Sequence, residues 1–174
     1  KLILDGVFNH TSSDSPYFDA DKRWDSSLNL LPQSQWGTND GSGACESLTS
    51  PYRGWYTFTG PGADPDCQIC IGGCYYKWGI FGTLPKLNAA NAGVRNLVYS
   101  GGTNSVARYW VNQGADGWRF DVGDEIDSGV THDPSNTFWE GFRTAVKAQN
   151  SDAIMLGEVW GDVSPLLLGN EWDS

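Results

Sequence analysis

Positive charge and long apolar runs are what this sequence has least of. It holds 11 Lys and Arg against 21 Asp and Glu, which gives a formal net charge of −10. Nucleic-acid binding needs a basic surface, and so does binding to an anionic membrane. No apolar run reaches the roughly 18 residues of a spanning helix. We therefore expect no nucleic-acid and no membrane partner, and we attribute the acidity to solubility.

Both ends of the chain read as cuts in a longer sequence. No signal peptide is visible, and the chain opens directly on the strand-like residues 1–4, Lys-Leu-Ile-Leu. Residues 171–174 end the chain without completing a helix or a strand. At 174 residues the chain is long enough for one domain with a core. We expect an internal piece of a longer protein.

Aromatic residues, in contrast, are abundant, with 9 Trp, 7 Tyr and 7 Phe. Flat rings stack on the apolar C–H faces of sugars, so this composition fits a carbohydrate-binding protein. Core packing accounts for many of the rings equally well. Composition alone therefore leaves both interpretations open.

The four cysteines all fall in the first half of the chain, at Cys45, Cys67, Cys70 and Cys74. This spacing could ligate zinc or form two disulfides. No histidine lies near the cluster, and an even count in an acidic, Trp-rich chain favours disulfides in an exported protein. We expect disulfides and an extracellular location, with the pairing among the cysteines left open.

The order of apolar patterns indicates an α/β fold. Residues 1–8 and the runs ending at Asp121 and Glu158 read as buried strands. Residues 12–76 have no regular period and read as an inserted subdomain. Helical patterns follow Asn91, which can cap a helix, and cover residues 106–113 and 136–149. Strands that alternate with helices predict a parallel sheet, with functional residues at the carboxyl ends of the strands.

Two apolar runs each deliver one carboxylate at a strand end. Residues 117–122 read Gly-Trp-Arg-Phe-Asp-Val, and residues 154–160 read Ile-Met-Leu-Gly-Glu-Val-Trp. Arg119 points to the same side of a strand as Asp121 and can hold it ionised, as a nucleophile requires. Apolar neighbours of Glu158 would raise the pKa of its carboxyl, which suits a general acid. Such a pair matches the carboxylates of glycosidases.

The end of the first strand carries a third polar group. His10 could hydrogen-bond a sugar hydroxyl, and Asn9 could support a loop or a metal. A capping pair at a strand end explains these two residues equally well. Asp5 lies inside the strand, and we expect it to bind neighbouring backbone in an architectural role.

Together these segments resemble the α-amylase family of glycoside hydrolases, family 13. Residues 5–10, Asp-Gly-Val-Phe-Asn-His, are similar to its first signature block, residues 117–122 to its second and residues 157–160 to its third. Residues 84–88, Leu-Pro-Lys-Leu-Asn, resemble a short block near the end of its domain B. Their form is nearest to neopullulanases, cyclomaltodextrinases and amylopullulanases.

The resemblance implies a partial TIM (β/α)8 barrel. Residues 1–10 would be barrel strand three, and residues 11–83 the inserted domain B. Residues 84–174 would continue the barrel through helix three, strand four, helix four and strand five. The family's fourth block, which holds its third catalytic carboxylate, is absent, so we expect this stretch alone to be inactive.

The resemblance also implies roles for single residues. Asp121 would be the nucleophile, and Glu158 the general acid and then base. Arg119 would orient Asp121, and His10 would bind the sugar. Asn9 would hold the base of domain B, sometimes beside calcium. Glu125 and Trp160 would line the subsites beyond the scissile bond.

The implied activity is hydrolysis of α-glucosidic bonds in starch-like α-glucans or pullulan by a retaining double displacement. Transglycosylation or cyclodextrin opening on the same site is the alternative among enzymes. A catalytically dead sugar-binding or transporter-associated relative is a further alternative, which the presence of Asp121, Glu158, Arg119 and His10 disfavours.

Overall fold

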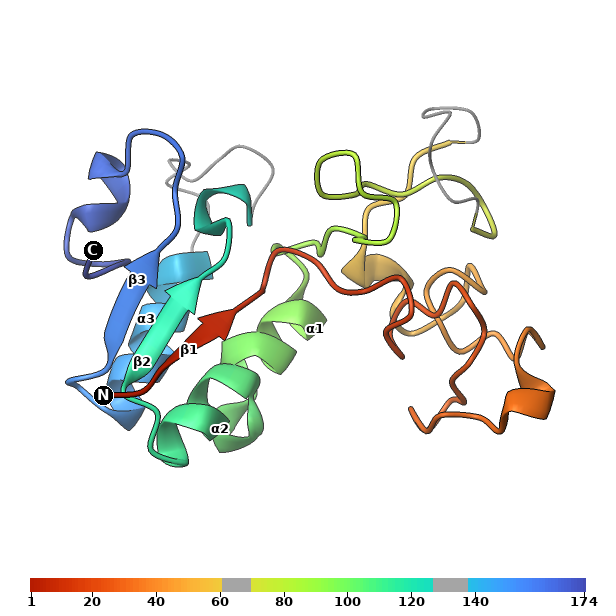
Figure 1. The fold of residues 1–174 in the computed structure, drawn as a ribbon, viewed down its shortest axis with the longest axis horizontal. Helices are drawn as coiled ribbons and strands as arrows, with labels where there is room; N and C mark the ends of the chain where they lie inside the picture. The colour runs from red at the N-terminus through yellow and green to blue at the C-terminus, as the bar shows by residue number, and fades with distance from the viewer. Residues whose placement is uncertain (61–69, 127–137) are drawn as a thin grey trace. The chain divides into compact units, whose positions relative to one another are not determined.

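The computed structural model describes residues 1–60, 70–126 and 138–174. It divides into two compact units, shown in Figure 1. The first, here the sheet unit, contains Lys1–Asn9 and Ala89–Ser174, and the second, here the loop unit, contains His10–Asn88. No helix within the described ranges is long and apolar enough to cross a membrane.

The sheet unit is built on three parallel strands in the order β1-β2-β3. These are β1 (Ile3–Gly6), β2 (Gly117–Phe120) and β3 (Ile154–Gly157). The parallel α/β arrangement confirms the fold class expected from the sequence. The strand predicted within residues 1–8 is present as β1, but its predicted burial was wrong for Leu2 and Val7, which flank β1 and are 57% and 47% exposed. β1 pairs only with β2 in this sheet, so its other edge lacks the cover of a central strand.

In the described part of the sheet unit, four short helical segments precede β2 and one longer helix follows it. Before β2 lie α1 (Ala92–Arg95), the π-helical turn η3 (Asn96–Ser100), η4 (Gly102–Asn104) and α2 (Val106–Asn112). The side chain of Asn91 caps α1 by accepting from the backbone N–H of Gly93 at 2.8 Å, which confirms the predicted cap. η5 (Gly123–Glu125), α3 (Phe138–Gln149) and η6 (Ser164–Leu167) complete the unit.

One face of β2 forms the core of the sheet unit. Trp118 and Phe120 alternate with Arg119 along the strand, so they point to the side opposite Arg119. There the ring of Phe142 in α3 packs against both, with centroids 6.3 Å from Trp118 and 5.1 Å from Phe120. Burial of this aromatic face leaves the polar residues of β2 on the other side of the sheet.

The last residues of the sheet unit pack against β3. Ser174 donates its backbone N–H to the carbonyl of Met155 at 3.3 Å, and its carbonyl accepts from Gly157 at 2.8 Å, the bonding pattern of parallel strands. The indole of Trp172 is 1% exposed and lies where a Cβ on Gly123 or Gly157 would stand, at 2.8 Å and 2.1 Å. Two glycines at the strand ends therefore make room for one Trp ring.

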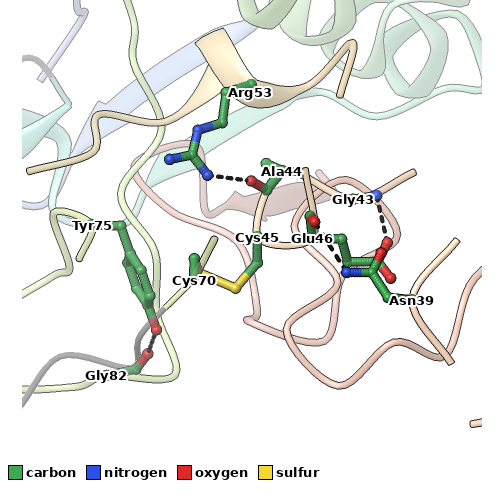
Figure 2. Close-up of a disulfide and its surroundings, with 9 residues drawn as sticks. All are labelled: Asn39, Gly43, Ala44, Cys45, Glu46, Arg53, Cys70, Tyr75 and Gly82. Atoms are coloured by element: carbon green, nitrogen blue, oxygen red, sulfur yellow. Dashed lines mark hydrogen bonds between the residues drawn. A yellow bond between two sulfur atoms is a disulfide. The ribbon is translucent and has the colours of Figure 1, made fainter. Parts of the chain in front are cut away.

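The loop unit has little regular structure, as the absence of a sequence period predicts. Its helical turns are η1 (Gln33–Gln35) and η2 (Arg53–Trp55). A disulfide joins Cys45 and Cys70, and the backbone around it is tied by Arg53, which donates to the carbonyl of Ala44 at 2.8 Å (Figure 2). Cys74 is also disulfide-bonded, whereas Cys67 lies outside the described residues. These bonds favour the disulfide prediction over zinc.

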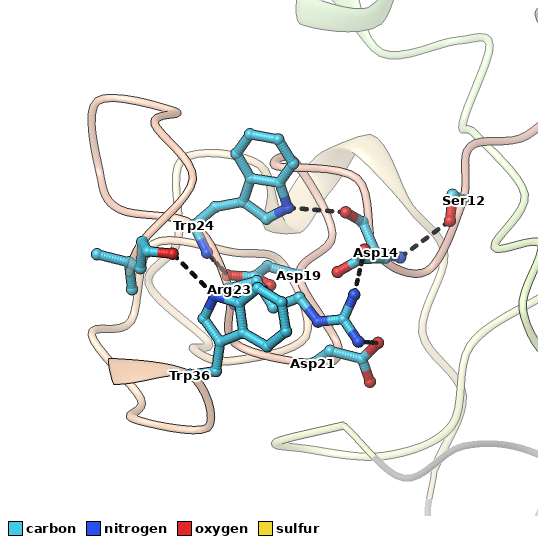
Figure 3. Close-up of polar contacts among 8 residues, drawn as sticks. Ser12, Asp14, Asp19, Asp21, Arg23, Trp24 and Trp36 are labelled. Carbon is cyan, nitrogen blue, oxygen red and sulfur yellow. Dashed lines mark hydrogen bonds and ion pairs between the residues drawn. The ribbon is translucent and has the colours of Figure 1, made fainter. Parts of the chain in front are cut away.

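A second polar cluster organises the start of the loop unit. Arg23 pairs with Asp14 at 2.9 Å and Asp21 at 3.4 Å, and its guanidinium lies 4.6 Å from the ring centroid of Trp36 (Figure 3). Asp19 is fully buried and accepts the backbone N–H groups of Arg23 and Trp24. These contacts stabilise a segment that has little helix or strand of its own.

Candidate active site

The carboxyl ends of the three strands bring four charged side chains to one side of the sheet. Asp5 and Arg119 are partners in the β1–β2 register. Phe120 pairs with Gly157, so the next pair in that register is Asp121 and Glu158. The backbone supports this pairing, since Glu158 donates its N–H to the carbonyl of Phe120 at 2.9 Å. The sequence prediction that Asp121, Glu158 and Arg119 meet at one sheet edge is therefore confirmed.

Arg119 lies at the centre of the site and contacts all three carboxylates. Its Nη1 lies 2.7 Å from Oδ1 of Asp5 and 3.0 Å from Oδ1 of Asp121. Its Nη2 lies 2.8 Å from Oε2 of Glu158. The side chains of Arg119, Asp121 and Glu158 are 34%, 27% and 30% exposed. Both carboxylates are therefore partly exposed while the guanidinium fixes their positions.

The largest influence on Arg119 comes from Asp5. The hydrogen bond to Asp5, followed by the one to Asp121, raises the pKa of the guanidinium above its usual value. We expected Asp5 to bind neighbouring backbone in an architectural role. Its side chain instead meets Arg119, because β1 and β2 run parallel and place register partners side by side.

The surroundings of Glu158 differ from the sequence prediction. We expected apolar neighbours, but its Oε2 accepts from Arg119 and from the backbone N–H of Val122, the latter at 3.2 Å. The two carboxylates therefore do not lie in opposed environments, since both pair with one cation. A sequence cannot show this, because the Arg119 side chain reaches across from the neighbouring strand.

The other predicted site residues are Glu125, Trp160 and Asn9 in the sheet unit and His10 in the loop unit. Glu125 is exposed in η5, and Trp160 follows β3 with 87% of its surface exposed. Asn9, the last residue of the first segment of the sheet unit, is fully buried. His10 belongs to the loop unit, where its ring stacks on that of Trp78 with centroids 5.6 Å apart.

Sequence reasoning missed two contributors to the site, Asp5 as a partner of Arg119 and Val122 as a donor to Glu158. A signal for the first was present, because an acidic residue inside an apolar strand needs a partner. No sequence signal marks a backbone N–H such as that of Val122.

The chain is similar to known proteins over almost its full length. The Alpha amylase, catalytic domain family matches residues 1–167. An amylopullulanase from Thermoanaerobacterium saccharolyticum is 36% identical over 185 residues, covering 100% of this chain and 12% of that protein. An intracellular maltogenic amylase from Bacillus subtilis is 29% identical over 174 residues, covering 99% of this chain and 22% of that protein.

Solved structures agree with the sequence comparison. The debranching enzyme of Nostoc punctiforme in its native form superimposes with a TM-score of 0.67 at 30% identity, covering 100% of this chain and 29% of that chain. This chain thus spans a small part of each of these proteins. Since the family matches almost the full length of the chain and the strand-end carboxylates lie together, the chain belongs to the α-amylase catalytic-domain family.

Proposed function

We propose that the protein containing this chain is a retaining glycoside hydrolase that cleaves α-glucosidic bonds in starch-like α-glucans or pullulan. The observation that carries the proposal is the bridging of Asp121 and Glu158 by Arg119 at the strand ends. One guanidinium that contacts both carboxylates keeps them close, and retaining enzymes need carboxyl groups only about 5–5.5 Å apart.

In the first step, the Asp121 carboxylate attacks the anomeric carbon. The bond from that carbon to the glycosidic oxygen breaks, its electron pair goes to the oxygen, and Glu158 donates a proton there. The product is a glycosyl ester on Asp121 and a free sugar hydroxyl. Arg119 supports this step because its Nη1 lies 3.0 Å from Oδ1 of Asp121 and orients that carboxylate.

In the second step, Glu158 acts as a base. Its carboxylate takes a proton from water while the water oxygen bonds to the anomeric carbon. The ester bond breaks and its electron pair returns to Asp121. Two displacements at one carbon retain its configuration. We assign sugar binding to His10, and lining of the subsites beyond the scissile bond to Glu125 and Trp160.

The family implies a TIM barrel, and the three parallel strands are part of such a sheet. We assign β1, β2 and β3 to barrel strands three, four and five, and the loop unit to domain B. The disulfide between Cys45 and Cys70 supports an extracellular location, because disulfides persist in oxidising compartments. The Bacillus subtilis relative is named as intracellular. The proposed extracellular location therefore rests on the cysteines of this chain and not on its relatives.

Calcium beside Asn9 remains a prediction. The described ranges contain no group of three or more Asp, Glu, His or Cys side chains that could hold a metal ion. Calcium usually needs six to eight oxygen ligands. The side chain of Asn9 is fully buried, and no step of the proposed mechanism uses a metal.

Turnover of pullulan and soluble starch tests the proposal in the protein expressed from the complete reading frame. We expect Asp121→Asn and Glu158→Gln to lower kcat by several orders of magnitude. Asp152→Asn, at an exposed position before β3, is the matched control and should retain activity. Nuclear magnetic resonance of the first product should show the α-anomer.

Each alternative gives its own result. A β-anomeric first product, or full activity of Asp121→Asn, would refute the retaining mechanism with Asp121 as nucleophile. Transfer of glycosyl groups to added sugar in preference to water would identify a transglycosylase on the same site. Binding of glucan without any turnover would identify a catalytically dead relative.

A further inference from the structure

Val122 has an unusual backbone conformation directly beside the two carboxylates. Its φ is 41° and its ψ is 50°, in the left-handed region. Four described residues other than glycine have positive φ, and Val122 is the β-branched one among them. Branched side chains are rare in this region because Cβ approaches the following carbonyl. Backbone strain of this kind is found at functional sites, where surrounding contacts hold it.

Several contacts hold Val122 in place. Its side chain is 5% exposed, so the residue is anchored in the core of the sheet unit. Its carbonyl accepts the N–H of Glu125 at 2.9 Å at the start of η5. The next residue, Gly123, donates to the carbonyl of Glu158 at 3.2 Å. The turn after β2 is therefore bonded to the end of β3 through Gly123, the residue directly after Val122.

The left-handed turn directs the Val122 N–H at one oxygen of Glu158. The distance from this nitrogen to Oε2 is 3.2 Å, and the same Oε2 accepts from Nη2 of Arg119 at 2.8 Å. An oxygen that accepts two N–H bonds has little capacity left to carry a proton. When Glu158 is a carboxylic acid, its proton is therefore directed to the other oxygen, Oε1.

We propose that Val122 is a positioning residue: its backbone N–H, aimed by the left-handed turn, occupies Oε2 of Glu158 so that the acid protonates the leaving group through Oε1. The inference rests on the proposed function, because it concerns the proton that Glu158 donates. It adds a backbone N–H to the groups that act in the acid step, and it gives a functional reason for the strained backbone of Val122.

Replacing the Val122 amide by an ester, through incorporation of α-hydroxyisovalerate in the complete protein, tests the proposal. This change removes the N–H and keeps the side chain. The rate should be measured on two substrates. Pullulan has a poor leaving group and needs the proton, whereas 2,4-dinitrophenyl α-maltoside has a leaving group that departs without protonation.

We expect the ester to lower kcat on pullulan about 10- to 100-fold, which is a part of the roughly 10²- to 10⁴-fold contribution of a general acid, and to change kcat on the dinitrophenyl substrate less than about 3-fold. The basic limb of the pH–rate profile on pullulan should also move. An equal loss on both substrates would show a merely structural role and overturn the proposal, and so would an unchanged rate on pullulan.

Two further variants keep the test decisive if the ester protein does not fold. Val122→Gly keeps the N–H but removes the buried side chain that anchors the turn, and should lose rate on pullulan more than on the dinitrophenyl substrate. Val122→Asn tolerates the left-handed region and should retain the wild-type ratio of the two rates. The same ratio in both variants would overturn the proposal. Absence of glycosidase activity in the unchanged protein would instead refute the proposed function itself.

Discussion

Asp5 and Arg119 face each other across the β1–β2 ladder, with Oδ1 and Nη1 2.7 Å apart. Asp5 is thus the third carboxylate on the guanidinium that also contacts Asp121 and Glu158. It lies on the first strand of the sheet, more than 100 residues from its partner along the chain. One end of the guanidinium is fixed by a residue that has no chemical step of its own.

The first prediction concerns this anchor. Asp5→Asn keeps the shape of the side chain and removes its charge, so Arg119 should lose orientation. We expect kcat on pullulan to fall about 10-fold with little change in KM, because misplaced groups cost rate rather than ground-state binding. Steady-state kinetics measure this, with Asp152→Asn as the control. A kcat equal to that of the unchanged protein would show that Asp121 and Glu158 hold Arg119 without help.

The second prediction concerns the packing under Glu158. In Gly157→Ala the new Cβ would stand 2.1 Å from the Trp172 ring, whereas the Cβ of Gly161→Ala would meet nothing within 4 Å. We expect Gly157→Ala to destabilise the protein by about 1–3 kcal/mol through overpacking and Gly161→Ala to have little effect. Denaturant unfolding of the two variants gives the comparison. Equal stability of both would mean that the Trp172 ring moves aside freely.

The third prediction concerns pH. Burial, together with the neighbouring charge and hydrogen bond of Glu140, raises the pKa of Glu171 to about 7. A folded-state pKa above the unfolded value means that the stabilisation is full below about pH 4.5, the unfolded pKa, and is lost as the pH rises through 7. The loss should be on the order of 1–3 kcal/mol.

Glu171→Gln removes this titration and isolates its effect. Thermal unfolding midpoints of the variant and of the unchanged protein should be recorded from pH 4 to pH 8, a range that spans about one unit beyond the raised pKa. We expect the difference between the two proteins to change in favour of the variant as the pH rises. Parallel curves across the whole range would contradict a raised pKa at Glu171.

The fourth prediction concerns the loop unit. The disulfide between Cys45 and Cys70 closes a loop with a sequence separation of 25. Loop-closure entropy then gives a stabilisation of about 3 kcal/mol. The double variant Cys45→Ala, Cys70→Ala should therefore be cleaved faster by protease within residues 10–88, with the sheet unit as the internal reference. Unchanged cleavage of the loop unit would show that its hydrogen bonds suffice without the disulfide.

The sheet unit was largely predictable because its residues follow simple rules. Alternation along β2 puts Trp118 and Phe120 on one side and Arg119 on the other. Parallel strands then bring their carboxyl ends together, which is why Asp121 and Glu158 could be paired from sequence. The position of Asn91 before an apolar helical pattern likewise indicated its cap.

What the sequence did not show depends on contacts between distant segments. The partner of Asp5 is determined by the register of β1 against β2, and the partner of Glu158 by the left-handed turn at Val122. The structure of the loop unit rests on a disulfide and on side chains such as Asp19 that bind backbone. Neither kind of contact has a sequence period, so pattern reasoning could only label residues 12–76 as an insertion.

Trp172 is synthesised after both strands that carry the carboxylates. Its ring fills the room beside Gly123 and Gly157, at the ends of the two strands that carry the carboxylates. During synthesis both strands, with Asp121 and Glu158, are made before this ring. The side of the sheet beside Gly123 and Gly157 is therefore covered only after residue 172 has left the exit tunnel.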